Sequence, residues 1–414
     1  MPALRKYETS HPWLKFELDM QRASARLWIA LGEAQSKCYH IAGVPLQPKI
    51  AKDMHEIYLA RGLLATTAIE GNTLTEKEVR DLLDKKLKLP PSRQYLAQEI
   101  DNILDACNRI LVDIKNHHIA PLSTTLIKTF NGLVLHKLKL DSEVVPGQIR
   151  KHSVGVGNYR GAPPEDCEYL LDRLCEWLNG SFNAPKGDEV IYGLIKSIIA
   201  HVYLAWIHPF GDGNGRTARL LEVKFLLEAG VPSAAAHLLS NHYNLTRAEY
   251  YKQLEQTTKT NGDLMPFIHY AVTGFVDQLR EQIETIQQQQ LNVSWVNYVH
   301  EKFGSQKSPA DRRQRDVVLA MSAKEGFIKP AEIRELNPNI AAQYATKTPK
   351  TVTRDLNRLK KLGLVESGQG GYRANIQLMV AFLPTSLNRA APRTPATPSE
   401  IEPQLELGLS FPSG

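Results

Sequence analysis

His208-Pro-Phe-Gly-Asp-Gly-Asn-Gly-Arg-Thr-Ala-Arg219 is a glycine-rich segment that separates two apolar stretches of the chain. Residues 191–206 and 220–229, which flank it, both have the composition of buried helices. Pro209 ends the first helix, because proline lacks an N–H group and clashes with the preceding turn. Three glycines let the backbone approach a ligand and adopt positive φ: Gly211, Gly213 and Gly215. The pattern predicts a ligand-binding loop between two central helices.

The polar residues of this segment are suited to phosphate chemistry. Backbone N–H groups at the start of the second helix, with the helix dipole behind them, form an anion site. Arg216 and Arg219 are three residues apart, so both can reach one polyphosphate. Asp212 supplies a carboxylate for Mg²⁺. His208, with an ordinary pKa of about 6.5, is the natural general base.

Three other interpretations of the segment were weighed. A calcium-binding EF-hand loop starting at Asp212 fails, because Arg216 takes a position that requires an oxygen ligand. A P-loop fails, because no Gly-Lys-Ser/Thr follows. A plain interhelical turn with solvated arginines explains the glycines, but not the combination of His, Asp, Asn and two Arg.

Residues 208–219 match, position for position, the signature H-P-F-x-D/E-G-N-G-R-x-x-R of Fic-domain proteins. The resemblance extends over roughly residues 41–274. It implies an all-α Fic fold with a small β-hairpin flap. It also implies a protein adenylyltransferase (an AMPylase), which transfers AMP from ATP to a Ser, Thr or Tyr hydroxyl of a target protein or of itself.

The resemblance also implies a role for each residue of the signature. His208 would deprotonate the incoming hydroxyl, Asp212 would hold Mg²⁺ against the phosphates, and Phe210 would anchor the loop in the core. Arg216 and Arg219 would bind the β- and γ-phosphates. The residues expected to contact ATP in this loop are Asp212, Gly213, Asn214, Gly215, Arg216, Thr217, Ala218 and Arg219.

Residues 144–164, rich in Gly, Pro and β-branched side chains, predict a short hairpin or flap closed by Pro163-Pro164. Within them, residues 150–164 resemble the Fic flap, whose edge binds the target segment by strand addition. Four flap residues would also line the nucleotide pocket: Val154, Gly155, Val156 and Gly157. Tyr250 matches a family tyrosine that flanks adenosine, although packing in the core is an equally good explanation.

Residues 66–72, Thr-Thr-Ala-Ile-Glu-Gly-Asn, resemble the inhibitory motif of the family, Ser/Thr-x-x-x-Glu-Gly/Asn. On a helix ending at Gly71, the Glu70 carboxylate could pair with Arg219 and occupy donors meant for the γ-phosphate. ATP would still bind, with its α-phosphate out of line for attack. Taken alone, a Glu before a Gly is an ordinary helix end. In some relatives the same glutamate helps to remove AMP from the target, so Glu70 could act both in the inhibition of AMP transfer and in AMP removal.

The positive charge of the chain is concentrated in one region. The 50 Lys and Arg residues exceed the 44 Asp and Glu residues by six. Residues 308–373 contain 13 basic and seven acidic residues, and so account for the whole excess. Apolar residues make up 43% and aromatic residues 7% of the chain, values that exclude a disordered chain, a collagen or a coiled-coil rod.

Residues 330–364 predict a helix-turn-helix within that basic region. The first helix is expected at residues 331–336, and the second has Pro349 in its first turn and Gly363 past its end. Residues 363–373 then suggest a wing hairpin. The region resembles a winged helix, a less specific match than the Fic signature. DNA and a protein partner are both open as its target.

The predicted domain order is an N-terminal helical region with the inhibitory helix (1–95), a catalytic core (96–290), a linker (291–307), a winged helix-turn-helix (308–378) and a disordered tail (379–414). The Gln287–Gln290 run is expected to end a polar helix and begin the linker. No signal peptide, C-x-x-C pair or uncharged membrane span is found, and a cytoplasmic protein is expected.

Two functions are therefore considered. The first is an autoinhibited adenylyltransferase that uses ATP and Mg²⁺, with His208 as base and Glu70 as brake. The second is a DNA-binding regulator whose Fic domain senses nucleotide. A homodimer is left open, and no membrane partner is expected.

Overall fold

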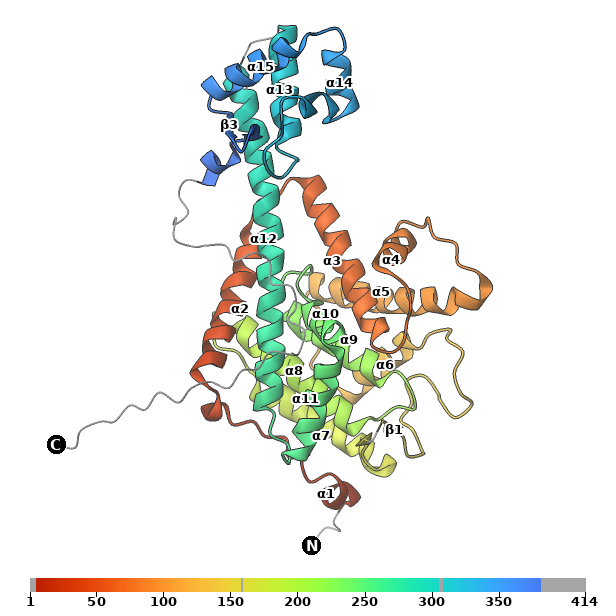
Figure 1. The fold of residues 1–414 in the computed structure, drawn as a ribbon. Coiled ribbons are helices and arrows are strands. Elements are labelled where there is room, and N and C mark those ends of the chain that lie inside the picture. Colours follow the sequence, from red (N-terminus) through yellow and green to blue (C-terminus); the bar gives the residue numbers. More distant parts are fainter. Residues whose placement is uncertain (1–4, 158, 305–307, 381–414) are drawn as a thin grey trace, which may run out of the picture. The chain divides into compact units, whose positions relative to one another are not determined.

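The computed structural model describes residues 5–157, 159–304 and 308–380 (Figure 1). The chain divides into two compact units, one ending at Gln290 and one beginning at Leu291. Both are mostly helical, and the only strands among the described residues form two small hairpins. The mostly helical class predicted from the sequence is confirmed.

Unit 1 is built from helices joined by short turns and one loop with a two-residue hairpin. Its helices are α1 (Lys6–Ser10), α2 (Ala25–Gly43), α3 (Pro48–Ala68), α4 (Glu76–Leu83), α5 (Gln94–Lys115), α6 (Thr124–Val134), α7 (Cys167–Ser181), α8 (Glu189–Ile207), α9 (Asn214–Glu228), α10 (Leu238–Leu245), α11 (Arg247–Lys259) and the first part of α12 (Met265–Phe303). Short 3-10 turns are η1 (Met20–Arg22), η2 (Pro91–Arg93) and η3 (Pro164–Asp166). Strands β1 (Gly155–Val156) and β2 (Tyr159–Arg160) pair antiparallel, with Val156 opposite Tyr159.

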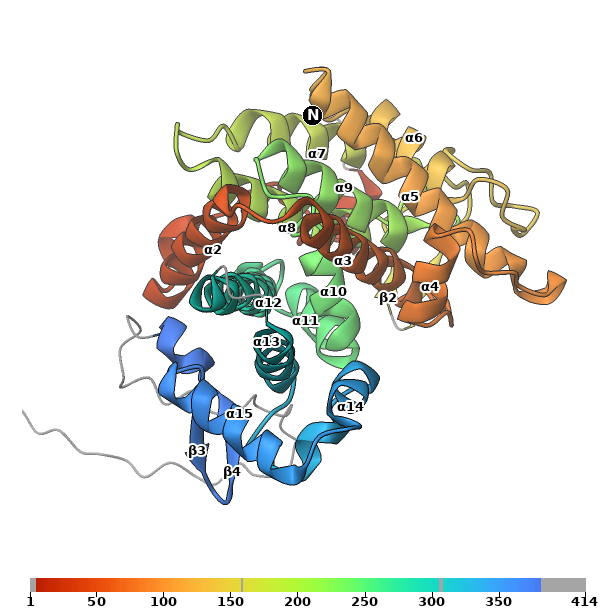
Figure 2. The ribbon, with the colours of Figure 1, turned by 90° about the horizontal axis from the view of Figure 1, so that it is seen from above.

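Helix α8 is the centre of unit 1, and it runs beside α9 with other helices of the unit around them (Figure 2). Its side chains are buried on most faces, as the apolar sequence predicts; examples are Leu194, Ile198 and Val202. By length and composition alone α8 could cross a membrane. However, 78% of its most apolar window is buried inside the fold, so these side chains already have protein partners.

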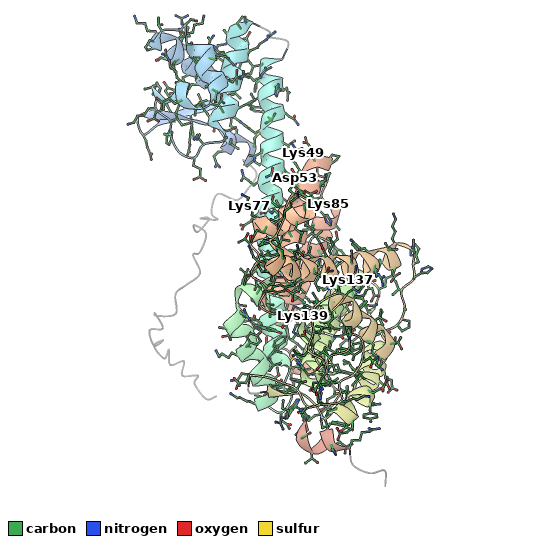
Figure 3. The ribbon with its side chains drawn as sticks, turned by 90° about the vertical axis from the view of Figure 1, so that its right-hand side faces the viewer. Lys49, Asp53, Lys77, Lys85, Lys137 and Lys139 are labelled. Atoms are coloured by element: carbon green, nitrogen blue, oxygen red, sulfur yellow. The ribbon has the colours of Figure 1, made fainter. Side chains whose placement is uncertain are left out.

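The surface of unit 1 carries charges of both signs, which matches its balanced composition. Figure 3 labels six exposed charged residues of α3, α4 and the loops that follow α4 and α6: Lys49, Asp53, Lys77, Lys85, Lys137 and Lys139. The Thr-x-x-Glu spacing of residues 75–78 predicts a capping box at the start of α4, and the structure confirms it. Thr75 accepts a bond from the Glu78 N–H at 3.2 Å, and the Glu78 carboxylate accepts one from the Thr75 N–H at 2.8 Å.

Helix α3 ends at Ala68, three residues earlier than predicted. Gly71 has φ of 104°, a left-handed conformation that glycine adopts easily and that continues no helix. The Asn72 N–H donates to the Thr67 carbonyl oxygen at 3.2 Å and closes the turn. Glu70 therefore lies in the turn after the helix and not within α3.

Unit 2 has its own core, around Trp295, Val317 and Leu356. Besides the end of α12, its elements are α13 (Pro309–Met321), η4 (Glu332–Glu335), α14 (Pro338–Tyr344), α15 (Pro349–Lys361), β3 (Val365–Gly368), β4 (Gly371–Ala374) and η5 (Ile376–Val380). The predicted hairpin is present, with Gln369 and Gly370 both at positive φ in its two-residue turn.

Two expectations about the C-terminal part of the chain are wrong. The helix expected to end at Gln290 continues to Phe303, so no linker begins at residue 291. Glutamine is a good helix former, and neither Gly nor Pro occurs between Gly274 and Gly304. The helix expected at residues 331–336 is the short 3-10 turn η4, and the helix before α15 is α14, which was not predicted. Of the expected tail, residues 381–414 lie outside the described residues.

Candidate functional site

His208 follows the last residue of α8 and has φ of 50°, a left-handed conformation that is rare for a non-glycine residue. Its Nδ1 lies 3.4 Å from the Ala205 carbonyl oxygen, and a proton on Nδ1 leaves Nε2 as the accepting nitrogen. Burial, together with the nearby Arg150 charge, lowers the pKa of His208 to about 4. The imidazole is therefore neutral near pH 7, as a general base must be.

Arg150, which the sequence analysis missed, fastens the His208 loop to the flap. It is 4% exposed and donates from Nε to the His208 carbonyl oxygen at 2.7 Å. It also donates to the carbonyl oxygens of His152 at 2.7 Å and of Ala162 at 2.5 Å. One side chain thus fixes the backbone on both sides of the site. No local motif points to it, because its partners are distant backbone carbonyls.

The three loop glycines have different roles, contrary to the expectation of positive φ at each. Only Gly213 has positive φ, at 74°. A Cβ on Gly211 would lie 2.9 Å from the Val144 side chain, and one on Gly215 would lie 2.1 Å from Glu70 Oε1. Gly211 and Gly215 are therefore explained by close packing, and Gly215 leaves room for the Glu70 carboxylate at the first turn of α9.

Helix α9 begins at Asn214, and the residues around its start hold the loop in shape. The Asn214 side chain donates to the Phe210 carbonyl oxygen at 2.8 Å and accepts from the Phe210 N–H at 3.0 Å. Phe210 is 1% exposed and anchors the loop in the core. Thr217 and Ala218 are buried in the fold. Asn131, a second residue that the sequence analysis missed, donates to the Asp212 carbonyl oxygen at 2.9 Å.

Both arginines of the loop are buried and paired with carboxylates. Arg219 Nη2 donates to Glu70 Oε1 at 2.5 Å and to the Thr66 carbonyl oxygen at 2.9 Å. Burial raises the pKa of the Glu70 carboxyl, but Arg219 outweighs this effect and leaves the pKa below its ordinary value. The structure therefore brings together the two residues that the sequence analysis expected to pair.

Arg216 binds two acids, one of which the sequence analysis missed. Its Nη2 donates to Asp212 Oδ1 at 3.1 Å, and its Nη1 donates to Glu99 Oε1 at 3.0 Å. Glu99 lies on α5, far from the loop in sequence, and nothing in its helical pattern distinguishes it. The Nε atoms of Arg216 and Arg219 have no hydrogen-bond partner among the described residues. Each guanidinium thus retains donors for an anion.

Asp212 is the acid of the loop that fits a metal ion. Within the described ranges, no group of three or more His, Cys, Asp or Glu residues is arranged to hold a metal. Mg²⁺ commonly binds proteins through one or two carboxylates and completes its shell with water and substrate phosphates. Asp212 can supply one such carboxylate, because its side chain is 46% exposed.

The flap lies where the sequence predicts, and hydrogen bonds hold it together and join it to the end of α8. The Gly161 N–H donates to the Val154 carbonyl oxygen at 3.1 Å, and the Tyr159 hydroxyl donates to the Trp206 carbonyl oxygen at 2.6 Å. Gly155, Val156 and Gly157 are exposed. An exposed two-residue strand is suited to pairing with another extended segment.

Tyr250 belongs to a buried polar cluster behind the loop. It is 4% exposed, its hydroxyl lies 2.8 Å from His201 Nε2, and its ring stacks on Tyr243 with 4.9 Å between centroids. His201 and Tyr243 in turn contact Glu222 Oε1, each at 3.0 Å. These contacts match the packing explanation of Tyr250, and contact with adenosine stays a prediction.

Comparison with known proteins places the loop in a family. Residues 121–226 match the Fic/DOC family. The chain is 29% identical over 243 residues to a protein adenylyltransferase Fic from Nematostella vectensis, which covers 58% of this chain and 52% of that protein. It is 32% identical over 207 residues to protein adenylyltransferase fic-1 from Caenorhabditis elegans, covering 50% of this chain and 37% of that protein. The chain thus spans about half or less of the length of these relatives.

A solved structure shows the same fold. The crystal structure of a Fic family protein from Desulfovibrio desulfuricans G20 superposes with a TM-score of 0.53 at 20% sequence identity, over 86% of this chain and 98% of that one. At this identity the match concerns the fold alone. The match to the Fic/DOC family model, over residues 121–226, therefore identifies a Fic domain in this part of the chain.

Proposed function

We propose that the protein is an autoinhibited protein adenylyltransferase that transfers AMP from ATP to a hydroxyl group of a protein. The observation that carries this proposal is the neutral His208 beside two buried arginines at the first turns of α9. A base and an anion site in one loop suit attack of a hydroxyl on a phosphate. The relatives named adenylyltransferases support the same reaction and do not favour a regulator that only senses nucleotide.

In the proposed reaction, His208 Nε2 takes the proton of the target hydroxyl, and the hydroxyl oxygen attacks the α-phosphorus of ATP. A P–O bond to AMP forms, the bond to the β-phosphate oxygen breaks, and pyrophosphate leaves. Arg216 and Arg219 hold the β- and γ-phosphates and stabilise the charge on the leaving group. Mg²⁺ held by Asp212 would neutralise phosphate charge. The exposed edge of the flap would align the target by strand pairing.

Autoinhibition in this proposal comes from Glu70. Its carboxylate occupies Arg219, the arginine assigned to the γ-phosphate, at 2.5 Å. With that donor engaged, the triphosphate would bind with its α-phosphate out of line for attack. Turning the Glu70 side chain away from Arg219 would restore the productive geometry.

The proposal is tested by incubating wild-type protein, Glu70→Gly and His208→Ala with ATP labelled at the α-phosphate, Mg²⁺ and a cell lysate. We expect labelled protein with Glu70→Gly, little with wild type, and none with His208→Ala. Mass spectrometry of the labelled bands should find AMP on a hydroxyl side chain. A Glu70→Gly protein that binds ATP without transferring any part of it would contradict the proposed reaction.

We propose a second activity for unit 2: the unit is a winged helix, and its helix α15 binds duplex DNA. Asp355, the one acidic residue of α15, is 2% exposed and accepts bonds from Arg313 at 2.8 Å and Tyr344 at 2.8 Å. The exposed side of α15 is therefore basic. Six of its residues line one shallow depression: Lys350, Thr353, Arg354, Asn357, Arg358 and Lys361. Such a face suits contacts to phosphates.

A further inference from the structure

Glu99 on α5 binds Arg216 through a different guanidinium nitrogen from the one that binds Asp212. Glu99 Oε1 accepts from Arg216 Nη1 at 3.0 Å, and Glu99 Oε2 accepts from Asn72 Nδ2 at 2.8 Å. The Glu99 and Arg216 side chains are 15% and 5% exposed. Both carboxylate oxygens are thus engaged in a site largely closed to water, where such bonds are stronger than on the surface.

The charges around the loop are unfavourable for a polyphosphate as long as this contact persists. Two arginines face three carboxylates here, because Arg219 pairs with Glu70 while Arg216 pairs with both Glu99 and Asp212. Burial raises the pKa of the Glu99 carboxyl above its ordinary value, and the charges of Asp212 and Glu70 add to this effect. The surroundings of Glu99 thus disfavour its negative charge, and an added phosphate would disfavour it further.

We propose that Glu99 competes with the nucleotide phosphates for Arg216, in the same way that Glu70 would compete for Arg219. The inference rests on the proposed nucleotide site and gives that site a second acidic restraint. In the resting protein each phosphate-binding arginine is then held by its own glutamate, one from the turn after α3 and one from α5.

Asn72 joins the two restraints. It lies two residues after Glu70, and its Nδ2 donates to the Leu96 carbonyl oxygen at 3.0 Å as well as to Glu99. Its Oδ1 accepts from the Leu74 N–H at 3.0 Å. The turn that carries Glu70 is therefore fastened to α5 through the side chain that also holds Glu99. A movement of this turn that frees Arg219 would also remove the hydrogen bond of Asn72 from Glu99 Oε2, so the two restraints are coupled through Asn72.

The test measures binding of the α,β-methylene analogue of ATP, which cannot transfer AMP, in the presence of Mg²⁺. Because Glu99→Gln keeps the size of the side chain but removes its charge, we expect the Kd to fall about fivefold or more. AMP lacks the phosphates assigned to Arg216, so its Kd should stay unchanged. Glu33→Gln is the matched control. It removes the same charge from the pair with Arg280 on the surface of unit 1, and its Kd for the analogue should equal that of wild type.

Analogue binding that is unchanged or weaker in Glu99→Gln, or equal tightening for AMP, would overturn the inference. If Glu99→Gln does not fold, a crystal structure of the wild-type protein with the analogue gives the answer. The Arg216–Glu99 contact should then be broken and a phosphate should lie on Arg216, whereas an intact contact would overturn the inference. If wild type, Glu70→Gln and Glu99→Gln all fail to bind the analogue, the proposed function itself is contradicted.

Discussion

Glu70 Oε1 lies 2.5 Å from Arg219 Nη2, although the two residues are 149 positions apart in the chain. Arg219 is almost completely buried, whereas the Glu70 side chain is 34% exposed and lies in a turn. The arginine is fixed by its helix and the glutamate reaches it from outside. The contact can therefore open from the Glu70 side without disturbing α9.

Removing the Glu70 carboxylate should activate the protein. We expect Glu70→Gly to label itself with AMP about tenfold faster than wild type or more, because a charge-assisted hydrogen bond to Arg219 no longer competes with the γ-phosphate. Glu70→Gln, which keeps the length of the side chain, should show most of the increase. The measurement is the initial rate of labelling with ATP labelled at the α-phosphate. Equal rates in all three proteins would remove Glu70 from any inhibitory role.

The pH dependence of transfer should report the depressed pKa of His208. Because that pKa is lowered to about 4, the neutral form persists as the pH falls through 6.5. The negative charge of Glu70 raises the pKa of His208, so removing this charge lowers the pKa further. We therefore expect the rate of Glu70→Gly to be nearly constant from about pH 8 to about pH 5.5. A rate that halves at about pH 6.5 would mean a histidine with its ordinary pKa.

The stability of unit 1 should decrease as the pH falls from about 6.5 toward 4. His208, His237 and His242 all have the pKa lowered to about 4, in each case mainly by burial. Over this range the unfolded chain binds protons at these residues while the folded chain does not, so protonation favours unfolding. The melting temperature should therefore be lower at pH 5 than at pH 7.

A variant can identify the contribution of one such histidine. His242→Gln cannot titrate, so its melting temperature should change less between these pH values than that of wild type. His118→Gln, in the exposed loop after α5, is the control and should behave like wild type. Identical pH dependence in all three proteins would show that burial of His242 does not couple folding to pH.

Arg150 should contribute strongly to stability although it carries no predicted chemical role. Arg150→Met leaves several buried carbonyl oxygens without their donor, and we expect a loss of about 3 kcal/mol in the free energy of unfolding. Arg173→Met removes an exposed pair with Glu176 and should cost no more than about 0.5 kcal/mol. Urea unfolding measures both. Losses of similar size would contradict the role of Arg150 in fastening loop and flap.

DNA binding by α15 should depend strongly on salt. The double variant Lys350→Ala/Lys361→Ala should weaken binding to a short duplex and reduce the slope of log K against log salt by about two. Lys324→Ala/Lys329→Ala removes the same charge from unit 2 outside α15 and should keep the slope. Binding that persists undiminished as the salt concentration rises would exclude contacts to phosphates. If unit 2 binds a protein and no duplex DNA, the DNA-binding proposal is contradicted.

Local sequence was sufficient where neighbouring residues determine the structure. The Thr75–Glu78 capping box, the end of α8 before Pro209 and the wing-like hairpin at Gln369-Gly370 follow from capping, proline and turn chemistry. The end of the long polar helix was not predictable in this way, because glutamine is compatible with both a helix and a linker. Packing of Trp295 and Val299 into the core of unit 2 extends α12 to Phe303.

The sequence by itself determined which residues we propose for phosphate chemistry, because one segment of the chain contains His208, Asp212, the glycines and both arginines. The resemblance to the inhibitory motif already pointed to Glu70 as the partner of Arg219, but only the tertiary structure decided that Arg216 binds Glu99. Glu70 comes from the turn after α3 and Glu99 from α5, and both reach α9 through packing between distant helices. Ion pairs between distant residues leave no periodic or local pattern in a sequence. The residue that links the two glutamates, Asn72, became visible only with the fold.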